Sequence, residues 1–265
     1  MTAVTTRKFE AILAYDLDNT LIYSRRRLSE INNPVCVEHL NGQEQSYMSQ
    51  RSVHLLQKIV ERWELIPVTT RSLEQYRRLE FPPTIRPKTA LAANGAILLI
   101  DDRVDETWRQ QSERLADLCR AELQNAAEIL AADPRVDLPP RMVDDMYLFL
   151  RALSDDAALD VADRLRRLTA LPVGISGRKV YAFPRGLDKG AALLRLKQRF
   201  SVGKVFAAGD APSTDLSLLK ESDAAFVPTE DMAQNLPPGK ARVCCRPYLF
   251  AEQFLEQVLS IVNTK

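Results

Sequence analysis

Two carboxylates one residue apart follow an apolar run near the start of the chain. Ala11 to Tyr15 is apolar, and Asp16 and Asp18 come directly after it. A buried strand of a parallel sheet reads as an apolar run, and ligands bind beyond the carboxyl ends of such strands. There, one carboxylate can act as a nucleophile or metal ligand while the other transfers protons. The alternative is a solvated turn in which Asp18 caps the next helix.

Three further segments carry polar groups in comparable positions. The apolar run 64–68 ends at Thr69, and the apolar run 205–208 ends at Gly209-Asp210, with Asp215 five residues further on. Lys189 stands just inside the start of an amphipathic segment. We interpret these residues as one set, although Thr69, Asp210 and Asp215 also suit turns and helix N-caps, and Lys189 also suits a solvated first turn.

The elements that must position these residues alternate between strand and helix patterns. Such alternation predicts a parallel sheet with crossover helices, an α/β fold. Apolar residues at helical spacing predict helices over 51–63 and from Leu73 to Leu79, the latter stopped by Pro82-Pro83. Asn41-Gly42, between two short segments, predicts a hairpin, and we expect this hairpin to help shape a substrate pocket.

Between residues 104 and 183 the pattern changes. A Leu/Ala-rich helix is predicted over 107–132, a strand over 146–150, a helix over 155–168 and a hairpin over 173–183. This α-β-α-β-β order predicts a small α+β unit inserted in the sheet domain. Arg178 and Lys179, near the hairpin tip, could contact an anionic or hydroxylated substrate, or they could simply be solvated.

Composition restricts the partners. The chain has 265 residues, with 36 Lys+Arg against 35 Asp+Glu, so bulk charge suggests neither a nucleic-acid nor a membrane-surface partner. No apolar run reaches the roughly 18 residues of a membrane span, and residues 1–10 lack an apolar signal core, so we expect a cytoplasmic protein. The sequence does not decide between a monomer and a homodimer.

The cysteines and histidines show no pattern that predicts chemistry. No metal-ligand spacing occurs among Cys36, Cys119, Cys244 and Cys245, and we expect reduced thiols. His39 and His54 lie away from the other candidate residues along the chain. We therefore assign no catalytic role to either histidine.

Taken in order, the four segments around Asp16, Thr69, Lys189 and Asp210 resemble the signature motifs of the haloacid dehalogenase-like superfamily. The segment Ala90–Leu98, Ala-Leu-Ala-Ala-Asn-Gly-Ala-Ile-Leu, is similar to a strand of its Cof-type, sugar-phosphatase-like branch. The resemblance covers about residues 10–100 and 180–230. It implies a Rossmann-like α/β core, which we assign to 1–103 and 184–265, and an α+β cap domain, which we assign to 104–183.

The resemblance also implies the site residues. Asp16 would be the nucleophile and a Mg²⁺ ligand, and Asp18 would supply a backbone carbonyl ligand and a side chain acting as general acid and base. Thr69 and Lys189 would hold the phosphoryl oxygens. Asp210 would complete the metal site, and Asp215 would hold metal-bound waters or orient Lys189. The candidate substrate-binding residues are Thr70, Arg71, Asn94 and Arg178.

Three positions depart from the superfamily pattern. Asn19 stands where glycine is usual, although Asn tolerates left-handed backbone well. The step from Asp210 to Asp215 is one residue longer than in the Cof-type branch, which makes the role of Asp215 less certain. Thr70 replaces the Gly of a Thr-Gly-Arg pattern, so Arg71 is a weaker candidate for substrate contact.

The predicted function is a Mg²⁺-dependent phosphatase that hydrolyses a small phosphorylated metabolite, such as a sugar phosphate, through an aspartyl-phosphate at Asp16. One alternative is a phosphotransferase or phosphomutase, in which a second alcohol accepts the phosphoryl group. Another is a regulatory protein that binds a phosphorylated ligand without turnover.

Overall fold

The computed structural model describes residues 8–244 and 250–263. Its central sheet has five parallel strands in the order β15–β14–β13–β1–β5, which confirms the predicted α/β class. The strands are β1 (Lys8–Tyr15), β5 (Glu64–Pro67), β13 (Ser201–Ala208), β14 (Ala224–Val227) and β15 (Ala241–Val243).

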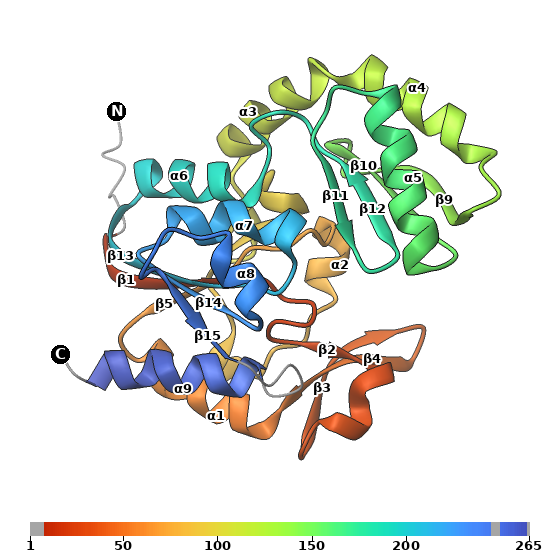
Figure 1. The fold of residues 1–265 in the computed structure, drawn as a ribbon. Helices are drawn as coiled ribbons and strands as arrows, with labels where there is room; N and C mark the ends of the chain where they lie inside the picture. Colours follow the sequence, from red (N-terminus) through yellow and green to blue (C-terminus); the bar gives the residue numbers. More distant parts are fainter. Residues whose placement is uncertain (1–7, 245–249, 264–265) are drawn as a thin grey trace.

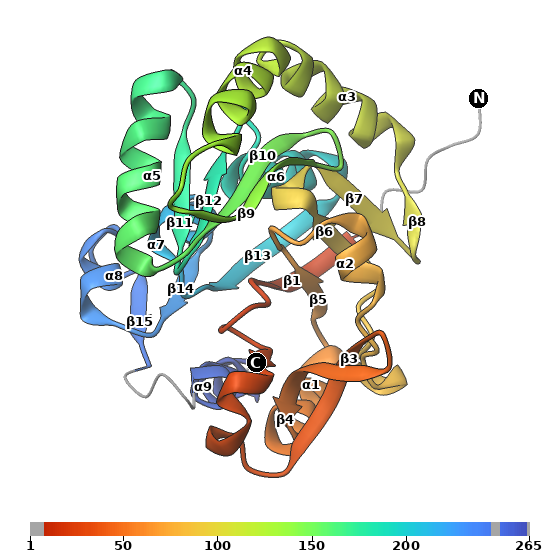
Figure 2. The same cartoon turned by 90° about the vertical axis from the view of Figure 1, so that its right-hand side faces the viewer.

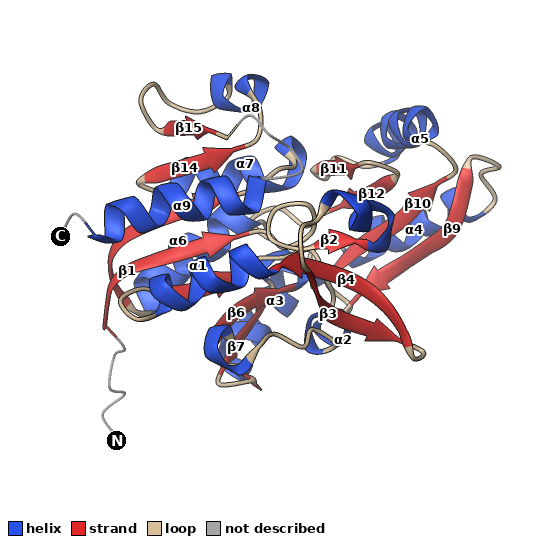
Figure 3. Ribbon diagram, turned by 90° about the horizontal axis from the view of Figure 1, so that it is seen from below, coloured by secondary structure: helices blue, strands red, loops and turns tan. Residues whose placement is uncertain are grey.

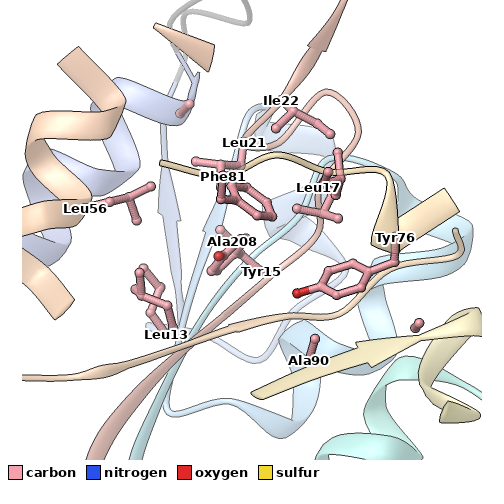
Figure 4. Close-up of a cluster of buried hydrophobic side chains, with 14 of the residues drawn as sticks. Leu13, Tyr15, Leu17, Leu21, Ile22, Leu56, Tyr76, Phe81, Ala90 and Ala208 are labelled. Carbon is pink, nitrogen blue, oxygen red and sulfur yellow. The ribbon is translucent and has the colours of Figure 1, made fainter. Parts of the chain in front are cut away.

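Helices cover both faces of this sheet (Figure 1). On one face lie α1 (Gln50–Val60) and α9 (Phe250–Asn263); on the other lie α6 (Lys189–Arg199), α7 (Pro212–Glu221) and α8 (Glu230–Gln234). Side-chain alternation along β1 explains this layering. Leu13 and Tyr15 pack with the α1 side, as Figure 4 shows, whereas Ile12 and Ala14 pack with the α6 and α7 side.

A hairpin extends the sheet beyond β5. It consists of β6 (Thr89–Ala92) and β7 (Ile97–Ile100), with the short β8 (Arg103–Val104) at its edge. A parallel bridge between Val68 and Leu91 joins it to the end of β5. The short helix α2 (Leu73–Arg77) and the 3₁₀ turn η2 (Pro83–Ile85) connect β5 to β6.

The predicted Asn-Gly hairpin is confirmed. Strands β3 (Pro34–Leu40) and β4 (Gln43–Ser49) pair across Asn41 and Gly42, whose φ angles of 53° and 74° suit the turn that favours this dipeptide. We call residues 34–49 the flap. The strand β2 (Tyr23–Ser24) pairs with β4, and the 3₁₀ helix η1 (Arg25–Glu30) leads into β3 (Figure 3).

A second, antiparallel sheet has the order β11–β12–β10–β9, and we call it the cap sheet. Its strands are β9 (Val136–Val143), β10 (Tyr147–Ala152), β11 (Val173–Ser176) and β12 (Lys179–Ala182). Helices α4 (Arg120–Ala131) and α5 (Asp155–Leu168) pack on its outer face through Leu148, Leu150 and Val180 (Figure 2). The alternate residues, among them Tyr147 and Tyr181, belong to the core cluster on the other side.

Two features of this region differ from the prediction. The single helix expected over 107–132 is two helices, α3 (Glu106–Asp117) and α4, because the chain turns at Leu118 and Cys119. The turn lets Trp108 of α3 pack with the central-sheet helices while α4 packs on the cap sheet. Strand β9 was not predicted because it contains Pro139-Pro140, which a sheet tolerates at an edge, where β9 lies.

Within the described residues, no helix combines the length and apolar character needed to cross a membrane.

Candidate functional site

The four motif segments meet at one edge of the central sheet. Strands β1, β5 and β13 are neighbours, and their carboxyl ends lie in register, with Tyr15 paired to both Pro67 and Ala208. The amide of Asp16 donates to the carbonyl of Ala208 at 3.0 Å. Asp16 therefore stands beside the loop that carries Asp210, as the sequence prediction requires.

Lys189 lies fully buried between two carboxylates. Its Nζ donates to Oδ1 of Asp16 at 2.5 Å and to Oδ1 of Asp215 at 2.7 Å. Asp188 caps α6 by accepting hydrogen bonds from the amides of Gly190 and Ala191, which fixes Lys189 in the first turn. A side chain at Gly190 would come within 2.5 Å of the Ser217 carbonyl, so glycine allows the close approach of α6 to α7 that brings Lys189 to Asp215.

Both oxygens of Asp215 already have partners. Oδ1 accepts from Lys189 and, at 3.2 Å, from the Thr214 hydroxyl, while Oδ2 accepts from the amides of Asp210 and Ala211. A Cβ at Gly209 would come within 2.6 Å of Asp215, so the glycine is needed for this arrangement. The geometry favours an Asp215 that orients Lys189 and shapes the Asp210 loop.

The carboxylates suit a hard divalent cation. Oxygens of Asp16, Asp210 and Asp215 lie within 4.8 Å of one another, and the Thr20 hydroxyl holds Oδ1 of Asp210 at 2.9 Å. Mg²⁺ prefers such oxygen donors and keeps several waters. Three acidic groups around a single buried ammonium leave an excess of negative charge, so the donor set fits Mg²⁺. The side chain of Asp18 is not part of this cluster.

Burial and the nearby negative charges both raise the pKa values of Asp16 and Asp210. Desolvation raises the pKa of Asp16 to about 7, against the lowering effect of Lys189. Desolvation, together with the charges of Asp215 and Asp16, also raises the pKa of Asp210 well above its usual value. A cation bound beside these two carboxylates would therefore favour their ionised forms. Within the described chain, no hydrogen bond reaches Oδ2 of Asp16, which leaves that oxygen available as a nucleophile.

Asp18 faces away from the metal cluster and pairs with Arg71. Nε and one terminal nitrogen of Arg71 donate to the two Asp18 oxygens, both at 2.9 Å. The other terminal nitrogen lies 2.9 Å from Oε2 of Glu38 on the flap. Burial alone would raise the pKa of Asp18, but the charges of Arg71 and Lys179 outweigh it and hold that pKa well below its usual range. Asp18 is therefore ionised while Arg71 holds it.

A cavity of about 120 Å³ opens beyond Asp18. The flap contributes Glu38 to its lining, α2 contributes Gln75, and the cap sheet contributes Arg141, Phe149 and Lys179. A larger cavity of about 490 Å³ lies on the other side of α2, around Phe81 and Lys88, and no predicted site residue lines it. The smaller cavity is thus the one that adjoins the candidate chemistry.

Hydrogen bonds between described residues hold the cap sheet against this edge of the core. The Tyr147 hydroxyl donates to the Thr70 carbonyl, and Asp144 accepts the Leu73 amide at 2.9 Å. On the other side, the Ile175 amide donates to Oγ of Ser213 at 2.8 Å, and Ser213 donates back to the Ile175 carbonyl. The candidate site is therefore covered on one side by the cap sheet and on another by the flap.

Of the remaining predicted residues, some lie at the candidate site and others lie away from its cavity. Thr69 is buried at the end of β5, where its hydroxyl accepts the Arg71 amide at 3.1 Å, and Thr70 and Arg71 line the small cavity. Asn94 does not line it; this side chain is buried and donates to the Leu187 carbonyl at 3.3 Å. Arg178 does not line it either, because its guanidinium hydrogen-bonds the Leu153 carbonyl and lies 3.7 Å from Asp137.

Several lining residues carried no usable sequence signal. Glu38 and Ser46 face each other across the flap, with the Ser46 hydroxyl donating to Glu38 at 2.5 Å, but their position over the site depends on tertiary packing. Arg141 lies on the strand that was not predicted. In contrast, the sequence did indicate Lys179 together with Arg178, and of the two Lys179 lines the cavity.

A second group of metal-ligand types occurs on the flap. Cys36, His39 and Glu44 lie within 4.8 Å of one another, with His39 and Glu44 exposed. A register irregularity in β3 brings Cys36 and His39 together, which their spacing in the sequence did not predict. Cys36 and Cys119 are free thiols, the Cys244 sulfur accepts a hydrogen bond from Gln257 at 3.3 Å, and Cys245 lies outside the described residues.

Comparisons with solved structures show the fold of this chain. No protein-family model and no curated protein sequence matches the chain. Solved structures do match over nearly its whole length. A sucrose-phosphatase from Synechocystis sp. PCC6803, solved with sucrose and phosphate, has a TM-score of 0.63 and 17% identity over 96% of this chain and 98% of that one. The chain has the haloacid dehalogenase fold.

Two further structures with this fold are similar. A trehalose-6-phosphate phosphatase related protein has a TM-score of 0.56 and 15% identity, covering 96% of this chain and 99% of that one. A subclass IIB sugar phosphatase of the haloacid dehalogenase superfamily has a TM-score of 0.54 and 12% identity, with the same coverage. The haloacid dehalogenase fold predicted from the motifs is thus confirmed over the described chain.

Proposed function

We propose that this protein is a Mg²⁺-dependent phosphatase that hydrolyses a small phosphorylated metabolite through an aspartyl-phosphate at Asp16. The observation that carries the proposal is the buried arrangement of Asp16, Lys189, Asp210 and Asp215 at the carboxyl edge of the sheet. The similar structures include phosphatases of sugar phosphates, which supports the substrate class.

The phosphoryl group would lie between Asp16 and Lys189. Oδ2 of Asp16 attacks phosphorus, the bond from phosphorus to the ester oxygen breaks, and a proton from Asp18 goes to the departing oxygen. Asp18 then takes a proton from water, whose oxygen attacks phosphorus, releasing inorganic phosphate and regenerating Asp16. Lys189 and Thr69 stabilise the negative charge on the phosphoryl oxygens.

Mg²⁺ would be held by Asp16, Asp210 and the backbone carbonyl of Asp18, with Asp215 behind them. When bound, it neutralises phosphoryl charge so that an anionic nucleophile can approach an anionic ester. The fully partnered oxygens of Asp215 support a role in positioning Lys189 and the Asp210 loop.

The Asp18–Arg71 ion pair must open for Asp18 to carry a proton. Arg71 would still have a carboxylate partner, because Glu38 lies 2.9 Å from the terminal nitrogen that does not contact Asp18. Glu38 would therefore act as a positioning residue that keeps Arg71 neutralised when Asp18 turns toward the leaving group.

The proposal is tested by phosphate release from a panel of phosphorylated metabolites, with Mg²⁺ or with EDTA. We expect release by the wild-type protein with Mg²⁺ and none by Asp16→Asn. Near-normal release by Asp16→Asn would rule out the covalent mechanism. Products in which an added alcohol carries the phosphoryl group would instead identify a phosphotransferase.

A further inference from the structure

The small cavity beyond Asp18 carries an excess of positive charge. Its lining includes the four cations Arg71, Arg78, Arg141 and Lys179, against the two carboxylates Asp18 and Glu38. If Asp16 holds the phosphoryl group and Asp18 faces the ester oxygen, this cavity receives the part of the substrate that departs as the alcohol. Its charge therefore bears on what that alcohol is.

The two carboxylates are already engaged by two of the cations. Asp18 accepts both its hydrogen bonds from Arg71. Glu38, which is 3% exposed, lies 2.9 Å from Arg71 and accepts a hydrogen bond from Arg78 at 3.1 Å. Charge within this group is balanced, so Arg71 and Arg78 do not require an anion from the substrate.

Lys179 and Arg141 have no such partners. Among the described residues, neither forms an ion pair, although both line the cavity. Lys179 is partly buried, and its pKa is raised by Tyr181 and by the Asp18 carboxylate, so its ammonium is charged at neutral pH. A charge withdrawn from water without a partner is costly, and a bound anion removes that cost for Lys179. Arg141 is exposed, so there a bound anion would replace water.

The cap sheet holds both cations on one face. Arg141, Phe149 and Tyr181 lie opposite one another on β9, β10 and β12, and Lys179 is two residues from Tyr181 on the same strand. The Arg141 guanidinium lies 5.3 Å from the centre of the Phe149 ring, which fixes it at the cavity mouth. The neighbouring Arg178, in contrast, is directed to Asp137.

We propose that the substrate carries a second anionic group, a carboxylate or a second phosphate, which Lys179 and Arg141 bind in this cavity. The inference rests on the proposed function, because it takes the phosphoryl end of the substrate to lie at Asp16. The substrate class is then a phosphorylated sugar acid or hydroxy acid, or a bisphosphate, and not a phosphorylated neutral sugar. A neutral alcohol would leave both cations without a counter-charge.

Three esters that differ in one group test this. Glucose 6-phosphate is neutral at the other end of the sugar, 6-phosphogluconate has a carboxylate there, and glucose 1,6-bisphosphate has a phosphate. Affinities are measured by calorimetry with the Asp16→Asn protein and Mg²⁺, so that no turnover interferes. We expect at least one of the two esters with a second anionic group to bind about tenfold or more tightly than glucose 6-phosphate. The preferred ester identifies carboxylate or phosphate as the group bound.

Further substitutions in the Asp16→Asn protein test which residues bind the second anionic group. Lys179→Gln and Arg141→Gln should each bring the ratio of affinities, for the ester with a second anionic group against glucose 6-phosphate, toward one. Arg178→Gln, which removes a cation outside the cavity, should leave this ratio unchanged. Equal affinity for all three esters, or an equal change of the ratio in Arg178→Gln, would overturn the proposal.

Failure of the phosphatase proposal would have a different signature. The wild-type protein would release no phosphate from any ester, including p-nitrophenyl phosphate, while the preference of the Asp16→Asn protein for esters with a second anionic group persisted and depended on Lys179. Phosphate release without that preference would refute the second anionic group and leave the phosphatase proposal standing.

Discussion

Arg71 is the residue on which three parts of the molecule converge. It belongs to the loop after β5, yet its guanidinium contacts Asp18 after β1, Glu38 on β3 and, at 3.3 Å, Ser46 on β4. A planar guanidinium can serve two carboxylates at once because its donors are arranged as a rigid fork. The ionisation of Asp18 therefore depends on how Arg71 divides its hydrogen bonds.

Replacing Glu38 tests this dependence. In Glu38→Gln, Arg71 loses its alternative carboxylate and holds Asp18 more tightly, so we expect proton transfer to the leaving group to be about tenfold slower. The loss of kcat should be larger for alkyl phosphates, whose alkoxides need a proton, than for p-nitrophenyl phosphate, whose leaving group needs little help. Steady-state kinetics with both kinds of ester measure the difference.

Glu74→Gln is the matched control. Glu74, like Glu38, lies near Arg78, at 3.7 Å, but its side chain is 86% exposed. Its replacement should therefore leave kcat unchanged for both alkyl phosphates and p-nitrophenyl phosphate. Equal losses for the two kinds of ester in Glu38→Gln would show that Glu38 stabilises the flap without affecting Asp18.

At this scale the sequence indicated the candidate site residues better than the residues that contact them. Asp16, Thr69, Lys189 and Asp210 were predicted because each stands at a strand or helix end, where local pattern determines position. The Asp18–Arg71 pair and the contribution of Glu38 depend on how separate segments approach one another. Arg178 was chosen over Lys179 because the sequence does not show which way a residue at a hairpin turn will face.

At the scale of elements, Asp133 joins the end of α4 to its neighbours. Its oxygens accept hydrogen bonds from Arg135, at the start of β9, and from Arg164 on α5. The hydrogen bonds from Arg135 and Arg164 outweigh the opposing effect of burial and hold the pKa of Asp133 well below its usual range. The carboxylate therefore stabilises the folded state only while it is ionised.

The sign of the pH effect follows from this lowered pKa. In the unfolded chain Asp133 titrates near its usual value of about 4, so its contribution is present above that pH and is lost as the pH falls toward the lower folded-state value. We expect Asp133→Asn to lower the free energy of unfolding by about 2 kcal/mol at pH 7 and by less near pH 3. Urea unfolding at the two pH values measures this; a pH-independent difference would contradict it.

Ser213 of α7 links that helix to the cap sheet through Ile175 of β11. Replacing it with alanine removes both hydrogen bonds to the Ile175 backbone, so we expect the Ile175 amide to exchange with solvent about tenfold faster. The Val180 amide, on the neighbouring strand β12, serves as the internal control. Unchanged exchange at Ile175, measured by NMR, would show that Ser213 does not hold the edge of the cap sheet.

Elements with a regular pattern were predicted well. Helix α5 has the predicted bounds, 155–168, and both hairpins form at their Gly-containing turns. The prediction failed where local pattern conflicts with packing. A continuous helical pattern conceals the turn at Leu118, which is set by packing on two different sheets, and Pro139-Pro140 conceals the edge strand β9.

At the scale of the whole molecule, the core, the flap and the cap sheet enclose one acidic centre. Asp16 lies close to Asp210 and Asp215 in the folded protein but is almost 200 residues from them along the chain. A cation held between Asp16 and Asp210 therefore binds only the folded state. Mg²⁺ should therefore raise the melting temperature by about 5 °C at saturating concentration. Differential scanning calorimetry with Mg²⁺ and with EDTA measures this shift.

Asp210→Asn should abolish most of that shift, because it removes a ligand oxygen whose charge burial makes costly. Glu128→Gln, on the exposed side of α4, removes an equal charge far from the cluster and should keep the full shift. A shift retained in Asp210→Asn would place the cation elsewhere in the molecule.

The overall architecture could be predicted because alternating strand and helix patterns leave few topologies for a parallel sheet. The division at residues 104 and 183 stays a prediction. The structure adds that α3, through Trp108, packs with the core helices although it falls within 104–183. The residues that line the small cavity could not be predicted, because they come from elements far apart along the chain.

The two prolines of β9 also affect how copies of this protein meet. A strand at the border of a sheet offers free amide hydrogens to any other extended chain, and this is a common route to aggregation. Pro139 and Pro140 have no amide hydrogen, and because successive amides of a strand point to opposite sides, one of the two removes a donor from that border. The prolines that make this strand difficult to predict from the sequence thereby also disfavour pairing of the cap sheet with strands of other molecules.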